Sequence, residues 1–183
     1  IIEIDSLIDA KDYEMAKEKV TEVLTKVPNN KLALLRRGRI EYNSKNRNYD
    51  GFHLFKADSL YPNDPEVYEY IGRYYSTIGE VEKAIKYMDK SIKIDPNEPQ
   101  LFYWRARFFE QSKEQQKAEN DYTQSLVLDS TITRFFNRAS FYERTNNFEK
   151  ALEDHTLAIS MEKENPKLYN QRANCYILKK DFT

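Results

Sequence analysis

Residue types along this chain return at an interval of 34 positions, and this period constrains the fold more than any other feature. The clearest copy occupies residues 65–98, where the recurring positions hold Tyr68, Ile71, Gly72, Tyr75, Ala84, Met88 and Pro96. The next copy places Phe102, Ala106, Phe109, Ala118 and Tyr122 in the same columns. The copy after it, displaced by one residue, holds Phe135, Ala139, Tyr142, Ala151 and Ala158. Repeats of this length bury their apolar faces against their neighbours, so the sequence predicts a stack of similar units.

Each copy carries the signals of two helices. Residues 81–88 place apolar side chains at the spacing of one helix face. Small residues such as Gly72 and Ala84 suit positions where two helix axes approach to about 8–10 Å. Pro62 and Pro96 follow the expected helix ends, because proline lacks the N–H that would continue a helix. The sequence therefore predicts an all-α fold.

This pattern of aromatic, small and proline columns resembles the tetratricopeptide repeat family. The resemblance covers nearly the whole chain and implies a right-handed α-α superhelix of about five and a half helix–turn–helix repeats. We expect repeats at about 1–30, 31–64, 65–98, 99–131 and 132–165, with a partial repeat at 166–183, in one domain that is a fragment of a longer chain. In the second repeat Asp50 stands where alanine is expected and Gly51 follows it, so the second helix there should start irregularly. The chain is expected to end as the second helix of the sixth repeat begins.

Composition and motifs argue against several classes of function. The 29 basic and 30 acidic side chains nearly cancel, which disfavours nucleic-acid binding, and no apolar run is long enough for membrane insertion. Phosphate-binding, zinc-protease and nucleophile motifs are absent from the sequence, so we expect no enzyme and no cofactor. With one cysteine and two histidines we expect no metal site, and we interpret His155 and Cys175 as packing residues.

One arginine column is best explained by a structural role inside the repeats. Arg105 and Arg138 each precede an aspartate by sixteen residues, whereas the third repeat replaces both members of the pair together, by Ile71 and Tyr87. Such matched replacement predicts ion pairs within the repeats, Arg105–Asp121 and Arg138–Asp154. We expect them to be partly exposed and to contribute about 0–1 kcal/mol each.

A second arginine column, Arg39, Arg73 and Arg107, recurs at the strict repeat interval. In proteins that resemble this family that column faces the concave surface, which implies a partner-binding groove lined by Arg39, Tyr42, Asn43, Arg73, Tyr103, Arg107, Phe136, Asn170 and Asn174. Guanidinium groups bind carboxylates and asparagine binds peptide backbone, so the groove suits an acidic segment. The alternative is that Arg73 and Arg107 pair with Glu69 and Glu110 of their own helices.

The resemblance implies a scaffold for protein–protein interaction. An alternative is the ligand-sensing or self-associating part of a larger regulatory protein, a kinase or a transcription factor. Neither end carries a polar capping helix, which allows self-association through the ends. The compartment stays open between cytoplasm and periplasm, and the abundance of Tyr, Asn and Lys is typical of a bacterial source.

Overall fold

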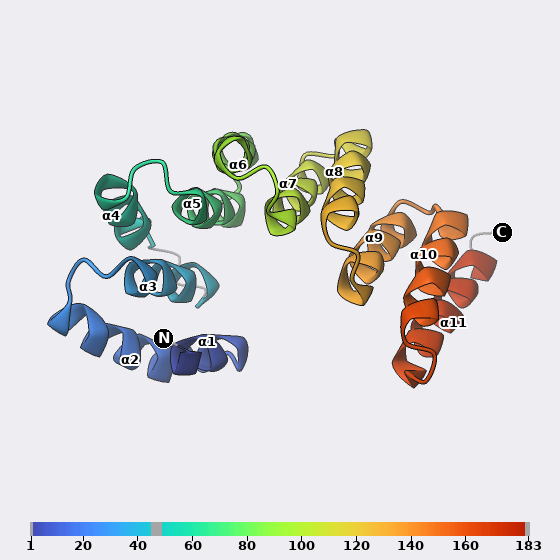
Figure 1. Ribbon diagram of the computed structural model, residues 1–183, viewed down its shortest axis with the longest axis horizontal. Helices are drawn as coiled ribbons and strands as arrows, with labels where there is room; N and C mark the ends of the chain where they lie inside the picture. Colours follow the sequence, from blue (N-terminus) through green and yellow to red (C-terminus); the bar gives the residue numbers. More distant parts are fainter. Residues whose placement is uncertain (1, 45–48, 182–183) are drawn as a thin grey trace. The chain divides into compact units, whose positions relative to one another are not determined.

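The computed structural model describes residues 2–44 and 49–181, without the side chains of Ile2 and Asp181. All regular structure in these ranges is helical (Figure 1). The first six helices are α1 (Ile2–Asp9), α2 (Tyr13–Lys26), α3 (Lys31–Asn43), α4 (Phe52–Leu60), α5 (Pro65–Thr77) and α6 (Val81–Ile94). The other five are α7 (Pro99–Gln111), α8 (Gln115–Leu128), α9 (Ile132–Arg144), α10 (Phe148–Met161) and α11 (Pro166–Asp181). The predicted all-α class is confirmed. None of the described helices has the length and apolar content that crossing a membrane requires.

The helices fall into two compact units, Ile1–Pro96 with α1 to α6 and Asn97–Thr183 with α7 to α11. Within the first unit α5 pairs with α6, and α3 packs against α2, α4 and α5. Within the second unit α7 pairs with α8, α9 with α10, and α11 packs against α10. Hairpins of neighbouring helices are therefore the building block of both units.

The small-residue columns lie where the helices approach one another. Ala84, Ala106, Ala139 and Ala151 are completely buried. A Cβ atom added to Gly38 would stand 2.3 Å from Cδ2 of Leu54, which is far inside van der Waals contact. The recurrence of small residues in the sequence thus reflects the close passage of helix against helix.

Side-chain caps start the first helix of several repeats. Asn30 accepts a hydrogen bond from the backbone N–H of Ala33, and Asp64 accepts two from Glu66 and Val67. Thr131 caps α9 in the same way. These caps satisfy N–H groups that a helix leaves without partners, and they fix where each repeat begins.

The second repeat departs from the others, as its sequence predicts. Helix α4 has nine residues, whereas α6, α8 and α10 have fourteen each. Gly51 precedes it in the left-handed region at φ 79°, and the Asp50 carboxylate accepts a hydrogen bond from the N–H of Phe52. Glycine tolerates this backbone conformation because it has no Cβ.

The end of the chain differs from the expectation. We expected the second helix of the sixth repeat to begin at its last residues, but α11 is one helix of sixteen residues through Asp181. No glycine or proline interrupts the helical run from Lys167 to Lys180, so the first helix continues. Phe182 and Thr183 lie outside the described residues.

Candidate functional site

Two buried ion pairs tie helices together in the second unit. Arg105 donates from Nε and Nη2 to both oxygens of Asp121, at 2.7 and 2.8 Å. Arg138 binds Asp154 in the same bidentate way at 2.9 and 2.7 Å. The two predicted pairs are confirmed, and these hydrogen bonds raise the pKa of Arg138 above its ordinary value.

The expected exposure of these pairs is wrong. The Asp154 side chain is only 2% exposed, because α10 turns it towards α9. Arg138 also donates to the hydroxyl of Thr123 at 3.0 Å, so one guanidinium joins α8, α9 and α10. A desolvated pair of this kind depends on both partners, and the loss of one partner is far more costly than at the surface.

The predicted groove arginines of the first unit already have partners. Arg39 binds Asp9 at 2.6 Å and lies 3.6 Å from Asp5, both on α1. Arg73 binds Glu69 at 3.2 Å, which is the pairing within one helix that the sequence offered as the alternative. Their side chains are 22% and 17% exposed, so little of either guanidinium faces water.

Aromatic rings also pack against the guanidinium of Arg73. The guanidinium of Arg73 lies over the rings of Tyr70 and Tyr42, at 5.1 and 5.9 Å from their centres. Tyr42, a predicted groove residue, is 9% exposed, and burial raises the pKa of its phenol. Asn43 is half-buried at the end of α3. Tyr42 therefore serves the packing of α3 against α5 rather than an open surface.

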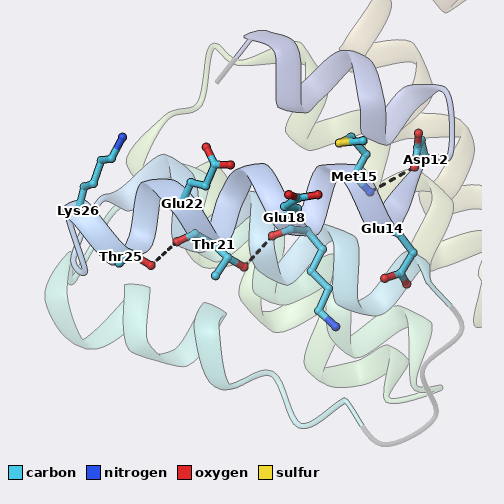
Figure 2. A pocket seen from close by; sticks show the side chains of 9 residues that line it. Asp12, Glu14, Met15, Glu18, Thr21, Glu22, Thr25 and Lys26 are labelled. Atoms are coloured by element: carbon cyan, nitrogen blue, oxygen red, sulfur yellow. Dashed lines mark hydrogen bonds between the residues drawn. The ribbon is translucent and has the colours of Figure 1, made fainter.

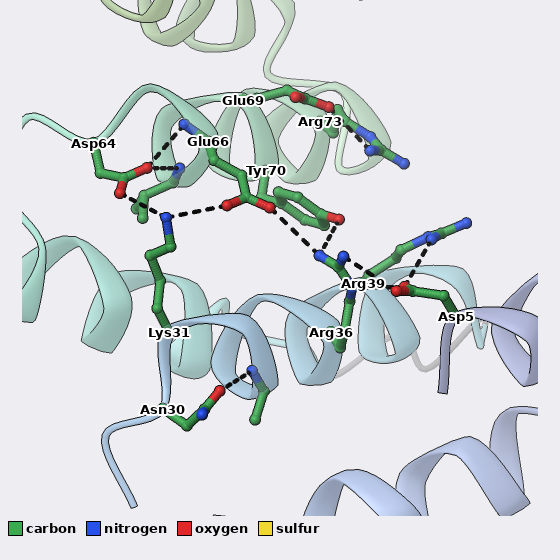
Figure 3. A network of polar contacts seen from close by, with 12 residues as sticks. Asp5, Asn30, Lys31, Arg36, Arg39, Asp64, Glu66, Glu69, Tyr70 and Arg73 are labelled. Carbon is green, nitrogen blue, oxygen red and sulfur yellow. Dashed lines mark hydrogen bonds and ion pairs between the residues drawn. The ribbon is translucent and has the colours of Figure 1, made fainter. Parts of the chain in front are cut away.

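A polar network continues across α1, α3 and α5 (Figure 3). Lys31 bridges Asp64 and Glu66 at 2.8 and 3.1 Å. Arg36 binds Asp5 at 2.6 Å, and it donates to the hydroxyl of Tyr70 at 2.8 Å. The charges of this face are matched inside the first unit, so the network holds the helices together.

The second unit presents a different surface on α7 and α9. Arg144 donates two hydrogen bonds of 3.0 Å to Glu110, and Arg107 lies 3.9 Å from the same carboxylate. The side chains of Arg107 and Arg144 are 50% and 51% exposed. Glu110 also accepts a hydrogen bond from the hydroxyl of Tyr122. One carboxylate thus faces two half-exposed guanidinium groups, which leaves an excess of positive charge.

Aromatic side chains lie on the same two helices as these arginines. Tyr103 accepts a hydrogen bond of 3.2 Å from Arg107, and Phe136 shares a face of α9 with Arg144 at a spacing of eight residues. We call Tyr103, Arg107, Phe136 and Arg144 the inner surface of the second unit. The exposure that singles out Arg144 is set by tertiary packing, so its position in the sequence does not mark it. Asn170 and Asn174 are exposed on α11, one turn apart.

The structure also brings together three residues that lie far apart in the sequence. A ring nitrogen of His155 lies 2.9 Å from Glu143, and Cys175 is close to both. His155 and Cys175 are 2% and 0% exposed. No linear sequence motif predicts this cluster, because its members belong to three successive helices.

A hollow of about 780 Å³ lies elsewhere, along the outer side of α2 (Figure 2). Its lining consists of Asp12, Glu14, Met15, Lys17, Glu18, Thr21, Glu22, Thr25 and Lys26. Acidic side chains outnumber basic ones there by four to two. The hollow is the outer face of one helix and contains none of the predicted groove residues.

Comparison with known proteins supports the repeat assignment. Residues 65–98 match the family model described as tetratricopeptide repeat. The third repeat thus matches this family model, and the described helices share the fold of a solved tetratricopeptide-repeat protein. Proteins of this family are generally non-enzymatic scaffolds. A comparison with curated proteins finds no match.

Solved structures share the fold at low sequence identity. TTC0263, a thermophilic tetratricopeptide-repeat protein in Thermus thermophilus, is 18% identical, with 95% of each chain covered and a TM-score of 0.82. A tetratricopeptide repeat protein from Parabacteroides merdae is 20% identical over 97% of this chain and 71% of that one, with a TM-score of 0.66. A chain of the APC/C hetero-tetramer Cut9–Hcn1 is 14% identical over 95% of this chain and 35% of that one, with a TM-score of 0.74. Similarities at this level establish the fold.

Proposed function

We propose that this chain is a non-enzymatic scaffold that binds an acidic segment of a partner protein on the inner surface of the second unit. The observation that carries the proposal is the pair of half-exposed guanidinium groups, Arg107 and Arg144, which share the single carboxylate of Glu110. A general role in protein–protein interaction is the class of function that the fold supports.

The chemistry of the surface suits a peptide with both charge and apolar side chains. Carboxylates of the partner can take the outer hydrogen-bonding positions of the two arginines, because each guanidinium has five N–H donors. Tyr103 and Phe136 offer aromatic area of the kind that anchors interfaces. Asn170 and Asn174 add amide groups that can bind peptide backbone, although their place in the same binding surface is part of the proposal.

Not every arginine of the predicted groove is suitable for a mutational test of binding. Charge reversal of Arg39 or Arg73 would break contacts between helices of the first unit, namely the pair of Arg39 with Asp9 and the stacking of Arg73 on Tyr42. A loss of binding would therefore be ambiguous. Arg107 and Arg144 carry the test better, since half of each side chain is exposed.

The test is selection of peptides from a displayed library of random dodecamers against the intact chain. We expect enrichment of Asp and Glu beside apolar residues, and the selected peptides should bind at least about tenfold more weakly to Arg107→Glu/Arg144→Glu. The control, Lys117→Glu/Lys163→Glu, changes the net charge equally at exposed positions of the same unit and should bind as the unchanged chain does. Selection without acidic enrichment, or equal binding by the two variants, would contradict the proposal.

A second candidate is self-association, which the exposed apolar side of α11 favours. Tyr176 and Ile177 are 57% and 60% exposed. The equivalents of Tyr169, Ala173 and Tyr176 in the fourth repeat are Phe102, Ala106 and Phe109, which are buried in the hairpin with α8. The described part of the chain has no helix that covers this side of α11. We propose that a second copy occupies it through the hollow of α2, where the side chain of Met15 is 43% exposed and offers an apolar contact.

A further inference from the structure

Three donor groups of different chemistry meet between α9, α10 and α11. Glu143 offers a carboxylate, His155 an imidazole and Cys175 a thiol, and one ligand atom from each lies within 4.8 Å of the others. His155 and Cys175 are almost completely buried, and the Glu143 side chain is 21% exposed. Titratable groups seldom gather in an interior unless they are paired or bind an ion.

The fifth repeat has a donor group at this cluster that the described equivalent positions of other repeats lack. A glutamate contacts a ring twelve residues later in three repeats: Glu41 with His53, Glu110 with Tyr122, and Glu143 with His155. Among the described residues, only in the last case does the following helix add a thiol within 4.8 Å. The paired contact is thus a recurring structural feature, whereas the third donor is a local addition.

The geometry points to a site for a divalent transition metal ion of the zinc class, held by Glu143, His155 and Cys175. Carboxylate oxygen, imidazole nitrogen and thiolate sulfur are the three donor types that bind zinc in proteins. Around a tetrahedral zinc ion the ligand atoms lie about 3.3–3.8 Å apart. Small rotations of the three side chains therefore bring separations within 4.8 Å into range. Three protein ligands leave one position for water.

Proton release accompanies binding at such a site. Burial and the neighbouring Glu143 raise the pKa of the Cys175 thiol to about 11, so the metal-free protein holds the proton at neutral pH. A metal ion binds the thiolate, so one proton leaves to solvent for each ion bound.

An ion at this place would join three helices and support the inner surface of the second unit. The rings of Phe136 and His155 lie 6.2 Å apart, so the cluster stands directly behind one aromatic member of that surface. The proposal does not depend on peptide binding, because metal binding is measured without a peptide.

Cobalt(II) is the probe, added to the untagged intact chain and followed by absorption spectroscopy. Because Cys175 is the only cysteine of the sequence, a thiolate-to-cobalt charge-transfer band identifies this site directly. We expect one ion per chain, intense visible bands typical of tetrahedral coordination, and displacement by zinc. Zinc should also raise the thermal unfolding temperature of the unchanged chain.

Cys175→Ser should abolish the charge-transfer band, and Glu143→Gln or His155→Asn should weaken binding at least about tenfold. His53→Asn is the matched control, since it removes a histidine paired with a glutamate at a place without a cysteine, and it should bind as the unchanged chain does. Absence of the thiolate band from the folded, unchanged chain would refute the site even where a variant fails to fold. Tight binding that survives the loss of His155 would also refute it.

Discussion

Asp154 shows how much one residue can contribute once the fold has removed it from water. Its carboxylate is 2% exposed and accepts two hydrogen bonds from Arg138. Deleting the carboxylate leaves the guanidinium of Arg138, which is only 18% exposed, without its bidentate partner. The penalty for this exceeds the favourable energy of the intact pair, because desolvation is no longer offset.

We therefore predict that Asp154→Ala lowers the free energy of unfolding by about 3–5 kcal/mol. Urea denaturation followed by circular dichroism measures the change. The control is Lys83→Gln, which removes an ion pair with Glu80 between side chains that are about half exposed. That variant should shift stability by less than about 0.5 kcal/mol. A loss for Asp154→Ala as small as that of the control would show that water reaches the pair.

At the scale of single elements, the start of α4 is constrained in both backbone conformation and space. Gly51 has φ 79°, and a Cβ atom there would lie 2.6 Å from Cε2 of Phe55. Gly79, in the turn between α5 and α6, has φ 85° but no atom within 4 Å of an added Cβ. The two glycines share a backbone conformation and differ in the space around them.

This difference predicts unequal effects of the same substitution. Gly79→Ala should destabilise the chain by about 1–2 kcal/mol, the conformational energy of an L-residue in the left-handed region. Gly51→Ala should cost at least about 1 kcal/mol more, because Phe55 must also move. Urea denaturation of both variants under one set of conditions gives the comparison. Equal losses would mean that the α4 start relaxes without strain.

At the scale of the whole molecule, the proposed self-association uses the exposed side of α11. A contact between α11 of one copy and α2 of another is heterologous, so it adds copies head to tail instead of closing a symmetric dimer. The hollow on α2 belongs to the first unit and the apolar side of α11 to the second, so each copy carries both halves of the proposed contact.

We predict that the mass measured by light scattering after gel filtration rises with protein concentration. Ile177→Glu should suppress this rise, because it places a charge in the proposed contact. Val127→Glu is the control: Val127 is also exposed, at 72%, but lies on α8. A constant monomer mass over a wide concentration range would contradict the proposal, as would equal suppression by the two variants.

Much of the fold was accessible from the sequence because its determinants are local and repeated. Helices α3, α5, α7, α9 and α11 begin at residues 31, 65, 99, 132 and 166, where the aromatic, small and proline columns restart. The Asp50–Gly51 dipeptide signalled the irregular start of α4, since glycine favours the left-handed conformation found there. The Arg138–Asp154 pair could be predicted because the third repeat replaces both the arginine and the aspartate of the corresponding columns.

The tertiary structure alone decided which side chains meet water. Arg39 is covered because α1 places Asp5 and Asp9 beside it, whereas Arg107 stays half exposed. Asp154 is buried although its sequence neighbourhood is polar, and Glu143, His155 and Cys175 converge from three helices. The spacing of residues fixes which helix face a side chain occupies. The exposure of that side chain depends on the neighbouring helix, which a one-dimensional pattern does not contain.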